Sequence, residues 1–185
     1  MLLIKHPGII IRGNHLEFPL LEQDFIDLEN ADLQLKPGDY VCIHPGARGE
    51  NRRWPTQYYA DLADLVISNG FKAVITGTND ELDLVNEVAA QMHHTPIIAA
   101  GRTSLGAVAV LIQNSYGLIS NCTGVAHIAS ALRKKSIVIS LEKEIDRWAP
   151  INRDVHSVIN WNKTQSLELV LGEAARWLEA NSHKS

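Results

Sequence analysis

Apolar residues follow two alternating patterns along most of the chain. Short, nearly continuous apolar runs occupy residues 40–44, 71–75, 96–100, 116–120 and 136–141. Runs of this length are typical of strands that are buried on both faces of a sheet. In the segments between them, apolar residues recur every three or four positions, as on the buried face of a helix. The alternation predicts repeated strand–helix units and therefore an α/β fold with a doubly wound parallel sheet.

The expected helices have recognisable ends. We expect Thr56 to cap a helix that ends at Gly70, and Thr103 or Ser104 to cap another. Hydroxyl side chains favour the N-cap position, and glycine favours the position just after a helix. The other expected elements are helices that begin at Thr78 or Asn79, near Thr123 and near Gln165, and a short strand at 155–161.

The first 38 residues do not follow this alternation. They predict a strand at 8–12, a short helix at 20–28 and a turn at 36–38. These elements are too few for a domain, and the whole length corresponds to little more than one domain of ~150 residues. We therefore expect residues 1–38 to be a linker or adaptor packed on one Rossmann-like domain at 39–185.

Composition and charge exclude several classes of protein. With 45% hydrophobic and 21% charged residues, the chain has the composition of an ordinary globular protein. Its net charge of -4 gives no overall attraction to nucleic acid, so an anionic ligand must be held locally. We expect no signal peptide or membrane span, since no apolar stretch approaches ~20 residues. Of two cysteines, Cys42 lies in an apolar run, which fits reduced thiols in the cytoplasm.

Polar, glycine-containing loops follow four of the expected strands, at residues 44–55, 76–81, 101–104 and 121–127. In an open parallel sheet, ligands bind in the crevice at the carboxyl ends of the strands. The four loops converge on that edge, so the sequence places its candidate binding residues there.

The loop at 44–55 suits an anion such as a diphosphate. Gly46 lets the backbone approach a ligand closely, and Arg48, Arg52 and Arg53 supply three cations in an acidic protein. The alternative is a solvated, charged loop without a ligand. Trp54 and the proline after it are expected to anchor the loop and to start the next helix.

The loop at 121–127 opens a helix and forms a second candidate phosphate site. The free amides at Thr123 and Gly124 and the positive end of the helix dipole face the crevice. His127 lies four residues after Thr123, on the same helical face, and is placed to donate to a phosphate or sugar oxygen. The alternative for His127 is a purely structural role.

Two further residues leave alternatives open. Cys122, at a helix start, is either a nucleophile with a lowered pKa or a small packing residue. We favour packing, because no base other than His127 and no catalytic cysteine motif accompanies it. Asp80 and Glu81 form either a helix cap or a carboxylate rim that holds ribose or sugar hydroxyls.

The histidines show no metal-ligand spacing, so no metal site is expected.

Five motifs occur in order along the chain. They are His-Pro-Gly-Ala at 44–47 with a basic residue two positions before Trp54, Thr-Gly-Thr-Asn-Asp-Glu at 76–81, Gly-Arg-Thr-Ser-Leu at 101–105, Asn-Cys-Thr-Gly-Val-Ala-His at 121–127 and Arg-Trp-Ala-Pro at 147–150. Together they resemble the C-terminal half of the ADP-heptose:lipopolysaccharide heptosyltransferases, glycosyltransferase family 9. The resemblance covers about residues 40–150 and implies one half of a two-domain GT-B fold.

The resemblance also implies roles for individual residues. Gly46 and Ala47 are expected against the diphosphate of an ADP-sugar donor, and Arg52 is expected as the catalytic cation that neutralises the leaving group. Glu81 is expected to hold the ribose, and Thr103 to lie near the adenine. The family's reaction is an inverting displacement at the anomeric carbon, with a carboxylate base from the N-terminal domain. No cofactor beyond the donor substrate is implied.

Thr123, Gly124 and His127 are expected to contact the diphosphate and the sugar, with Cys122 beside them.

The sequence departs from the family pattern in three ways. Cys122 stands where the family usually has Asp, and Arg52 replaces a Lys, which keeps the charge but changes the geometry. The N-terminal acceptor-binding domain is absent, so the chain resembles a fragment or a single domain.

The leading hypothesis is a donor-binding domain of a heptosyltransferase-like enzyme of lipopolysaccharide core synthesis, inactive without its acceptor domain. The resemblance implies an acceptor of the lipopolysaccharide type at the membrane surface. It also implies that the protein lies in the cytoplasm or at the periphery of the inner membrane. The alternative is a non-catalytic nucleotide-binding module with a degenerate transferase site. A Rossmann dehydrogenase is disfavoured, because no Gly-x-Gly-x-x-Gly follows the first strand.

Overall fold

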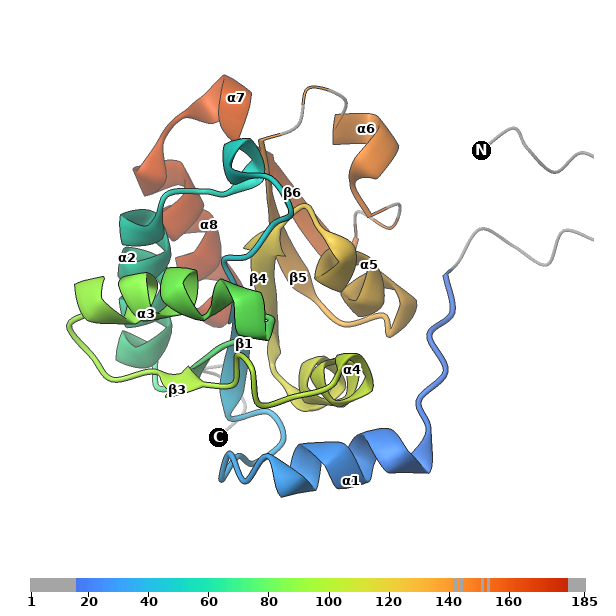
Figure 1. Ribbon diagram of the computed structural model, residues 1–185. Coiled ribbons are helices and arrows are strands. Elements are labelled where there is room, and N and C mark those ends of the chain that lie inside the picture. The colour runs from blue at the N-terminus through green and yellow to red at the C-terminus, as the bar shows by residue number, and fades with distance from the viewer. Residues whose placement is uncertain (1–15, 142, 144, 151, 153, 180–185) are drawn as a thin grey trace, which may run out of the picture.

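A parallel sheet of six strands forms the centre of the structure (Figure 1). The computed structural model describes residues 16–141, 143, 145–150, 152 and 154–179. The strands are β1 Tyr40–His44, β2 Lys72–Ile75, β3 Ile97–Ile98, β4 Gly117–Asn121, β5 Ser136–Ser140 and β6 His156–Asn160. All neighbouring pairs are parallel, in the order β3-β2-β1-β4-β5-β6. The predicted doubly wound α/β fold is confirmed.

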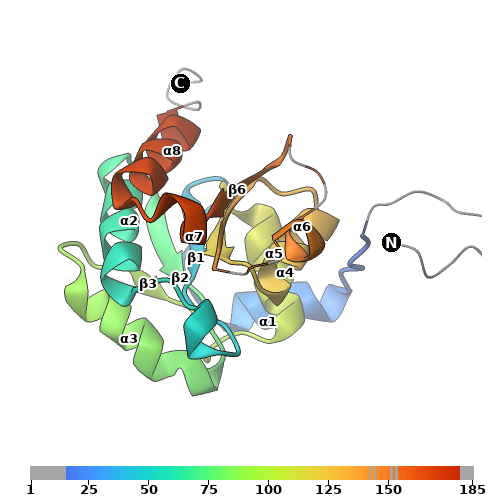
Figure 2. The ribbon, with the colours of Figure 1, turned by 90° about the horizontal axis from the view of Figure 1, so that it is seen from above.

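Helices cover both faces of the sheet, as Figure 2 shows from above. One face carries α2 Thr56–Ser68, α3 Leu82–Gln91 and α8 Leu167–Glu179. The other carries α4 Leu105–Asn114 and α5 Gly124–Ala131, with α1 Glu22–Asn30 packed on α4. The short helical segments are the 3₁₀ turns η1 Glu50–Arg52 and η2 Asn79–Glu81, and the helices α6 Ile145–Trp148 and α7 Trp161–Thr164.

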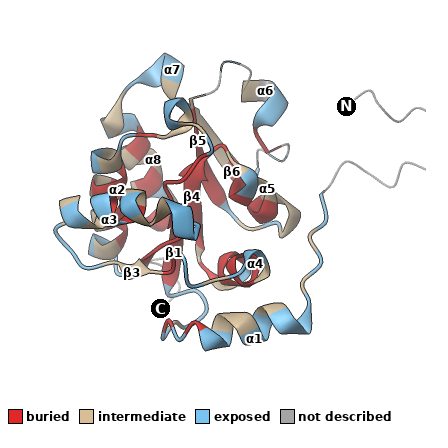
Figure 3. Ribbon diagram, viewed as in Figure 1, coloured by how far each residue is buried: buried red, intermediate tan, exposed pale blue. Residues whose placement is uncertain are grey.

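The strands supply two hydrophobic cores because successive side chains point to opposite faces. On β1, Val41 and Ile43 pack toward α2, whereas Tyr40 and Cys42 pack toward α4. All five residues of β1 are buried, and burial is concentrated in the central strands (Figure 3). Two-sided burial is the reason for the continuous apolar runs in the sequence.

Several expected element ends differ from those observed. The expected strand at 96–100 forms only Ile97–Ile98, because it is an edge strand with β2 as its one neighbour and Pro96 has no N–H to donate. Thr56 is the first helical residue of α2, and Pro55 occupies the cap position. The Thr56 hydroxyl donates instead to Glu87 Oε1 on α3, at 2.8 Å.

Other expected boundaries are as observed. Ser104 caps α4, where its Oγ accepts a hydrogen bond from the Ala107 amide at 3.2 Å. Gly70 follows α2 with φ +87°, a conformation that side chains with a Cβ rarely adopt. Thr78 begins a capping box ahead of η2 and α3.

The described part of the N-terminal region packs on α4. Helix α1 matches the expected helix at 20–28, and Asp27 Oδ2 accepts a hydrogen bond from Ser104 Oγ at 2.9 Å. A Cβ on Gly106 would overlap Asp24, so the two helices approach closely at this glycine. The strand expected at 8–12 lies outside the described residues.

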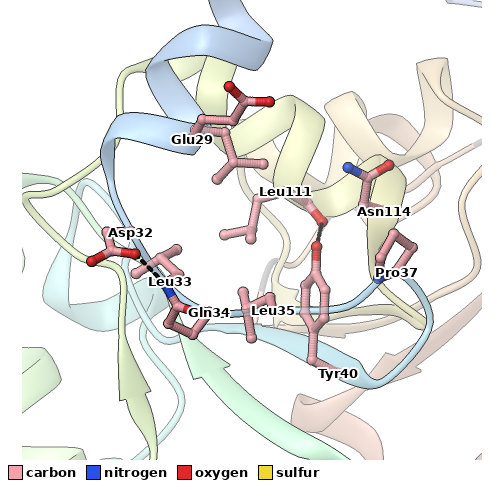
Figure 4. A pocket seen from close by; sticks show the side chains of 10 residues that line it. Glu29, Asp32, Leu33, Gln34, Leu35, Pro37, Tyr40, Leu111 and Asn114 are labelled. Atoms are coloured by element: carbon pink, nitrogen blue, oxygen red, sulfur yellow. Dashed lines mark hydrogen bonds between the residues drawn. The ribbon is translucent and has the colours of Figure 1, made fainter.

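A hollow of about 330 Å³ lies between α1, the segment that leads to β1, and the end of α4 (Figure 4). Its walls include Leu33, Tyr40 and Leu111, and the Tyr40 hydroxyl donates to the Leu111 carbonyl at 2.8 Å. Burial raises the pKa of Tyr40, so the hydroxyl stays a donor. Tyr40 begins β1, so this hollow lies at the amino end of the sheet, opposite the polar loops.

Candidate functional site

A cleft of about 630 Å³ lies at the carboxyl ends of the strands. It is centred where the strand order reverses, between β1 and β4, which is the position at which doubly wound sheets bind ligands. Of the nine residues that the resemblance places in the donor site, seven line it: Ala47, Arg52, Glu81, Cys122, Thr123, Gly124 and His127. The other two, Gly46 and Thr103, are not part of its lining.

Asn121, the last residue of β4, holds the loop after β1 at both ends. Its side chain is fully buried, and Nδ2 donates to the carbonyls of Pro45 at 2.7 Å and Gly46 at 3.4 Å. Its Oδ1 accepts from the Trp54 amide at 3.0 Å. The sequence analysis did not assign Asn121 a role; an amide at the end of an apolar strand was the available signal.

Trp54 anchors the same loop, as expected. It is 1% exposed and meets Tyr59 and Trp161 edge to face, with ring centroids 5.2 and 5.4 Å apart. Aromatic contacts of this geometry add to the stabilisation that burial provides. The end of the loop is therefore fixed against α2 and α7.

Arg52 joins the loop after β1 to the loop after β4. Its Nη2 donates to the Cys122 carbonyl at 3.2 Å, and its side chain lines the cleft while remaining partly buried. Arg48 also lines the cleft, whereas Arg53 donates from Nε to the Ala47 carbonyl at 3.0 Å and ties the loop to itself. Arg48 and Arg52 thus present the positive charge that the sequence led us to expect.

The start of α5 also lines the cleft. Thr123 is the N-cap, and Gly124 has no atom within 4 Å of where a Cβ would lie, so its backbone is open to a ligand. First-turn amides and the helix dipole make such a position favourable for an anion. His127 lies one turn further on and also lines the cleft.

Glu81 caps a helix and also lines the cleft, so the cap interpretation is confirmed, whereas a contact with ribose hydroxyls stays a prediction. Its Oε2 accepts from the Thr78 amide at 2.9 Å. A Cβ on Gly46 would overlap the Glu81 carboxylate. The absence of a side chain at Gly46 therefore makes room for Glu81, and its expected contact with the diphosphate stays a prediction.

His44 is a cleft residue that the sequence analysis did not single out. Its Nδ1 lies 3.0 Å from Thr76 Oγ1, and its Nε2 lies 4.0 Å from Glu81 Oε2. Thr76 Oγ1 donates to the Ile43 carbonyl at 3.3 Å, which leaves it to accept from a protonated Nδ1. Burial lowers the pKa of His44 below its usual value, although the neighbouring Glu81 carboxylate opposes this effect. The imidazole is accordingly neutral at pH 7.

The lowered pKa of His44 predicts a stability change with pH. Below about pH 6.5 the unfolded chain takes up a proton at this residue before the folded chain does. Protonation of His44 therefore does not reduce the free energy of unfolding above that pH. Below it, the free energy of unfolding falls by at most about 1.4 kcal/mol per pH unit. Urea unfolding at several pH values measures the decline.

In His44→Gln, the free energy of unfolding is expected to fall less steeply as the pH is lowered, whatever the effect of the substitution on stability at neutral pH. His93→Gln, at an exposed site, is the matched control and should leave the slope unchanged. An unaltered slope in His44→Gln would assign the decline to another group.

Residues 18–174 match the model of a protein family described as glycosyltransferase family 9 (heptosyltransferase). The chain belongs to this family. It is 26% identical over 181 residues to lipopolysaccharide heptosyltransferase 2 of Salmonella typhimurium, covering 89% of this chain and 52% of that protein. It is 32% identical over 102 residues to lipooligosaccharide heptosyltransferase 2 of Haemophilus ducreyi, covering 52% and 29%.

A solved structure shows the same fold. The structure of Escherichia coli ADP-heptose lps heptosyltransferase II aligns with a TM-score of 0.75 at 24% identity, covering 90% of this chain and 54% of that one. The chain thus spans about half the length of these full-length family 9 relatives. This confirms the expected architecture of one half of a GT-B-type fold.

Cys122, where the resemblance led us to expect Asp, is buried. Its Sγ donates to the Trp148 carbonyl at 3.4 Å, and it packs with Ala126 and Val138. These contacts agree with a packing role. The thiol therefore links the start of α5 to α6 at one end of the cleft.

Thr103 lies beside the cleft, where its hydroxyl donates to the Ala99 carbonyl at 3.3 Å. Leu105, two residues further along, lines the cleft instead and is 65% exposed. An apolar residue at the first position of a helix, next to a polar loop, was the signal that could have identified it.

The described residues contain no cluster of three or more His, Cys, Asp or Glu arranged to hold a metal ion. Among the same residues, no helix has the length and apolar character needed to cross a membrane.

Proposed function

We propose that this chain binds the ADP-sugar donor of a heptosyltransferase-like glycosyltransferase of lipopolysaccharide core synthesis. The observation that carries the proposal is the cleft at the reversal of strand order, which is lined by Arg52 and by the start of α5. Membership of family 9 and the name of the E. coli relative, an ADP-heptose enzyme, support this choice of donor.

The diphosphate fits the centre of the cleft. Arg48 and Arg52 approach it from the loop after β1, and Thr123 and Gly124 offer backbone amides from α5. Charge-assisted hydrogen bonds and a helix dipole together favour a dianion even in a protein of net charge -4. The nucleoside then lies on the β2 side, where the Glu81 carboxylate is positioned to accept from ribose hydroxyls.

In the proposed reaction, an acceptor hydroxyl attacks the anomeric carbon while the bond from that carbon to the β-phosphate oxygen breaks. ADP leaves with the electron pair, and the configuration inverts. Arg52 and the α5 amides stabilise the charge that develops on the diphosphate. The acceptor proton passes to a carboxylate of the N-terminal acceptor domain, so this half alone does not complete the transfer.

The partners in this proposal are therefore the ADP-sugar, the acceptor domain and an acceptor of the lipopolysaccharide type at the inner-membrane surface. No cofactor beyond the donor is required. The proposed location is the cytoplasm or the periphery of that membrane.

Calorimetric titration tests the proposal. ADP should bind much more tightly than adenosine, because most of the charged contacts involve the diphosphate, and its affinity should fall as salt screens them. Adenosine affinity should change little with salt. Equal affinities for ADP and adenosine would contradict the proposed diphosphate site.

A non-catalytic nucleotide-binding module is the second candidate, favoured by the buried Cys122 at the position of the family's Asp. Such a module would hold ADP-heptose through its ADP part alone. Substitutions on the β5 side of the cleft would then weaken ADP and ADP-heptose equally.

A further inference from the structure

Trp148 is an unusually exposed aromatic residue for its position. The chain has four tryptophans, all of them described, and Trp148 is 42% exposed, whereas Trp54 is 1% exposed. Trp148 belongs to the Arg-Trp-Ala-Pro motif, ends α6 and lines the cleft. Large apolar surface left open inside a cleft is characteristic of ligand contact.

The order of the strands decides which part of a donor reaches Trp148. The loop after β2, with Glu81, lies on one side of the β1–β4 centre, and the segment after β5, with Trp148, lies on the other. A diphosphate held between Arg52 and α5 has the nucleoside at one end and the sugar at the other. With the ribose beside Glu81, the sugar must extend toward β5 and Trp148.

The surroundings of Trp148 suit a sugar ring. The Arg147 guanidinium lies over one face of the Trp148 ring, 5.1 Å from its centroid, so a sugar would pack against the other face, and His127 lines the same cleft. An aromatic face packs against the C–H groups of a pyranose, while neighbouring polar side chains bond its hydroxyls. The hydrogen bond from Cys122 Sγ to the Trp148 carbonyl fixes the backbone beneath the ring.

We propose that Trp148 is a specificity-determining residue that packs against the sugar of the ADP-sugar donor. The inference rests on the proposed function, since that function places the diphosphate and the ribose. It adds a sugar contact on the β5 side of the cleft, next to the position where Cys122 replaces the family's Asp.

The experiment is titration of ADP and ADP-heptose into the wild-type chain, Trp148→Ala and Trp148→Phe. Trp148→Ala should weaken ADP-heptose by roughly tenfold and ADP by less than about twofold. Trp148→Phe should recover most of the ADP-heptose affinity, because it retains an aromatic face. The Cys122 bond is to a backbone carbonyl, so neither substitution removes its acceptor.

Two controls separate the sugar contact from general damage. Leu105→Ala, on the nucleoside side of the cleft, should weaken ADP and ADP-heptose by the same factor. Leu169→Ala, at an exposed position of α8, should change neither affinity. Unchanged ADP binding by Trp148→Ala itself shows that the cleft is intact in that variant.

The outcomes distinguish this inference from the proposed function. If the wild-type chain binds ADP but Trp148→Ala shifts both ligands equally, or neither, the sugar contact is wrong and the nucleotide site remains. If the wild-type chain binds ADP no better than adenosine, the proposed function fails, and the inference fails with it.

Discussion

Arg52→Ala is expected to weaken ADP binding by roughly 1–3 kcal/mol, which is the range for a hydrogen bond to a charged group. The Arg52 guanidinium lines the cleft and is held at its edge by the hydrogen bond from Nη2 to the Cys122 carbonyl. The substitution removes a cation from the lining of the proposed diphosphate site. Calorimetric titration with ADP measures the loss.

Two further variants show whether the loss of affinity comes from the charge at position 52. Arg52→Lys restores the residue usual in the family and keeps the charge, so it should bind ADP more tightly than Arg52→Ala. Arg176→Ala changes the net charge equally, but at an exposed position of α8 that does not line the cleft, and should have little effect. If Arg52→Ala behaves like Arg176→Ala, the phosphate site lies elsewhere.

Asn121→Ala is expected to lower the free energy of unfolding by about 2–4 kcal/mol. The substitution leaves the Trp54 amide and the Pro45 carbonyl without their buried partner, and an unsatisfied buried group costs about 1–3 kcal/mol. It also releases the loop that carries Arg52, so ADP binding should weaken as well. Urea unfolding and ADP titration give the two readouts.

Asn69→Ala is the matched control, because Asn69 Nδ2 also donates to a backbone carbonyl, that of Leu65, at an exposed site. Water can replace that bond, so the expected cost is below about 1 kcal/mol. Equal costs for the two alanine variants would show that the buried Asn121 network does not hold the loop.

The sequence by itself determined the layered fold. Strand β1 coincides with the apolar run at 40–44, because a strand buried on both faces needs continuous apolar residues. The same local pattern failed at 96–100, where only Ile97–Ile98 pair. The length of an edge strand depends on its single neighbour, and apolar character alone does not reveal which strands lie at the edge.

The sequence also determined three of the loops that form the cleft, whereas no residue of the fourth, at 101–104, lines it. Loops after parallel strands converge on one edge whatever their detailed conformation, so residues such as Ala47, Arg52 and Thr123 were brought together as expected. This part of the site follows from the topology.

Only the tertiary structure decided how the loops are held and which side chains complete the cleft. The bond from Asn121 to Pro45 spans 76 residues, and that from Arg52 to Cys122 spans 70. Gly46 leaves space for the Glu81 carboxylate, and the backbone of Trp148 accepts a hydrogen bond from Cys122, so these contacts also cross between loops. Apolar periodicity and helix-cap motifs depend on interactions between residues that are close together in the sequence. Contacts between loops depend on the distances set by the folded sheet, and for that reason local sequence patterns did not reveal them.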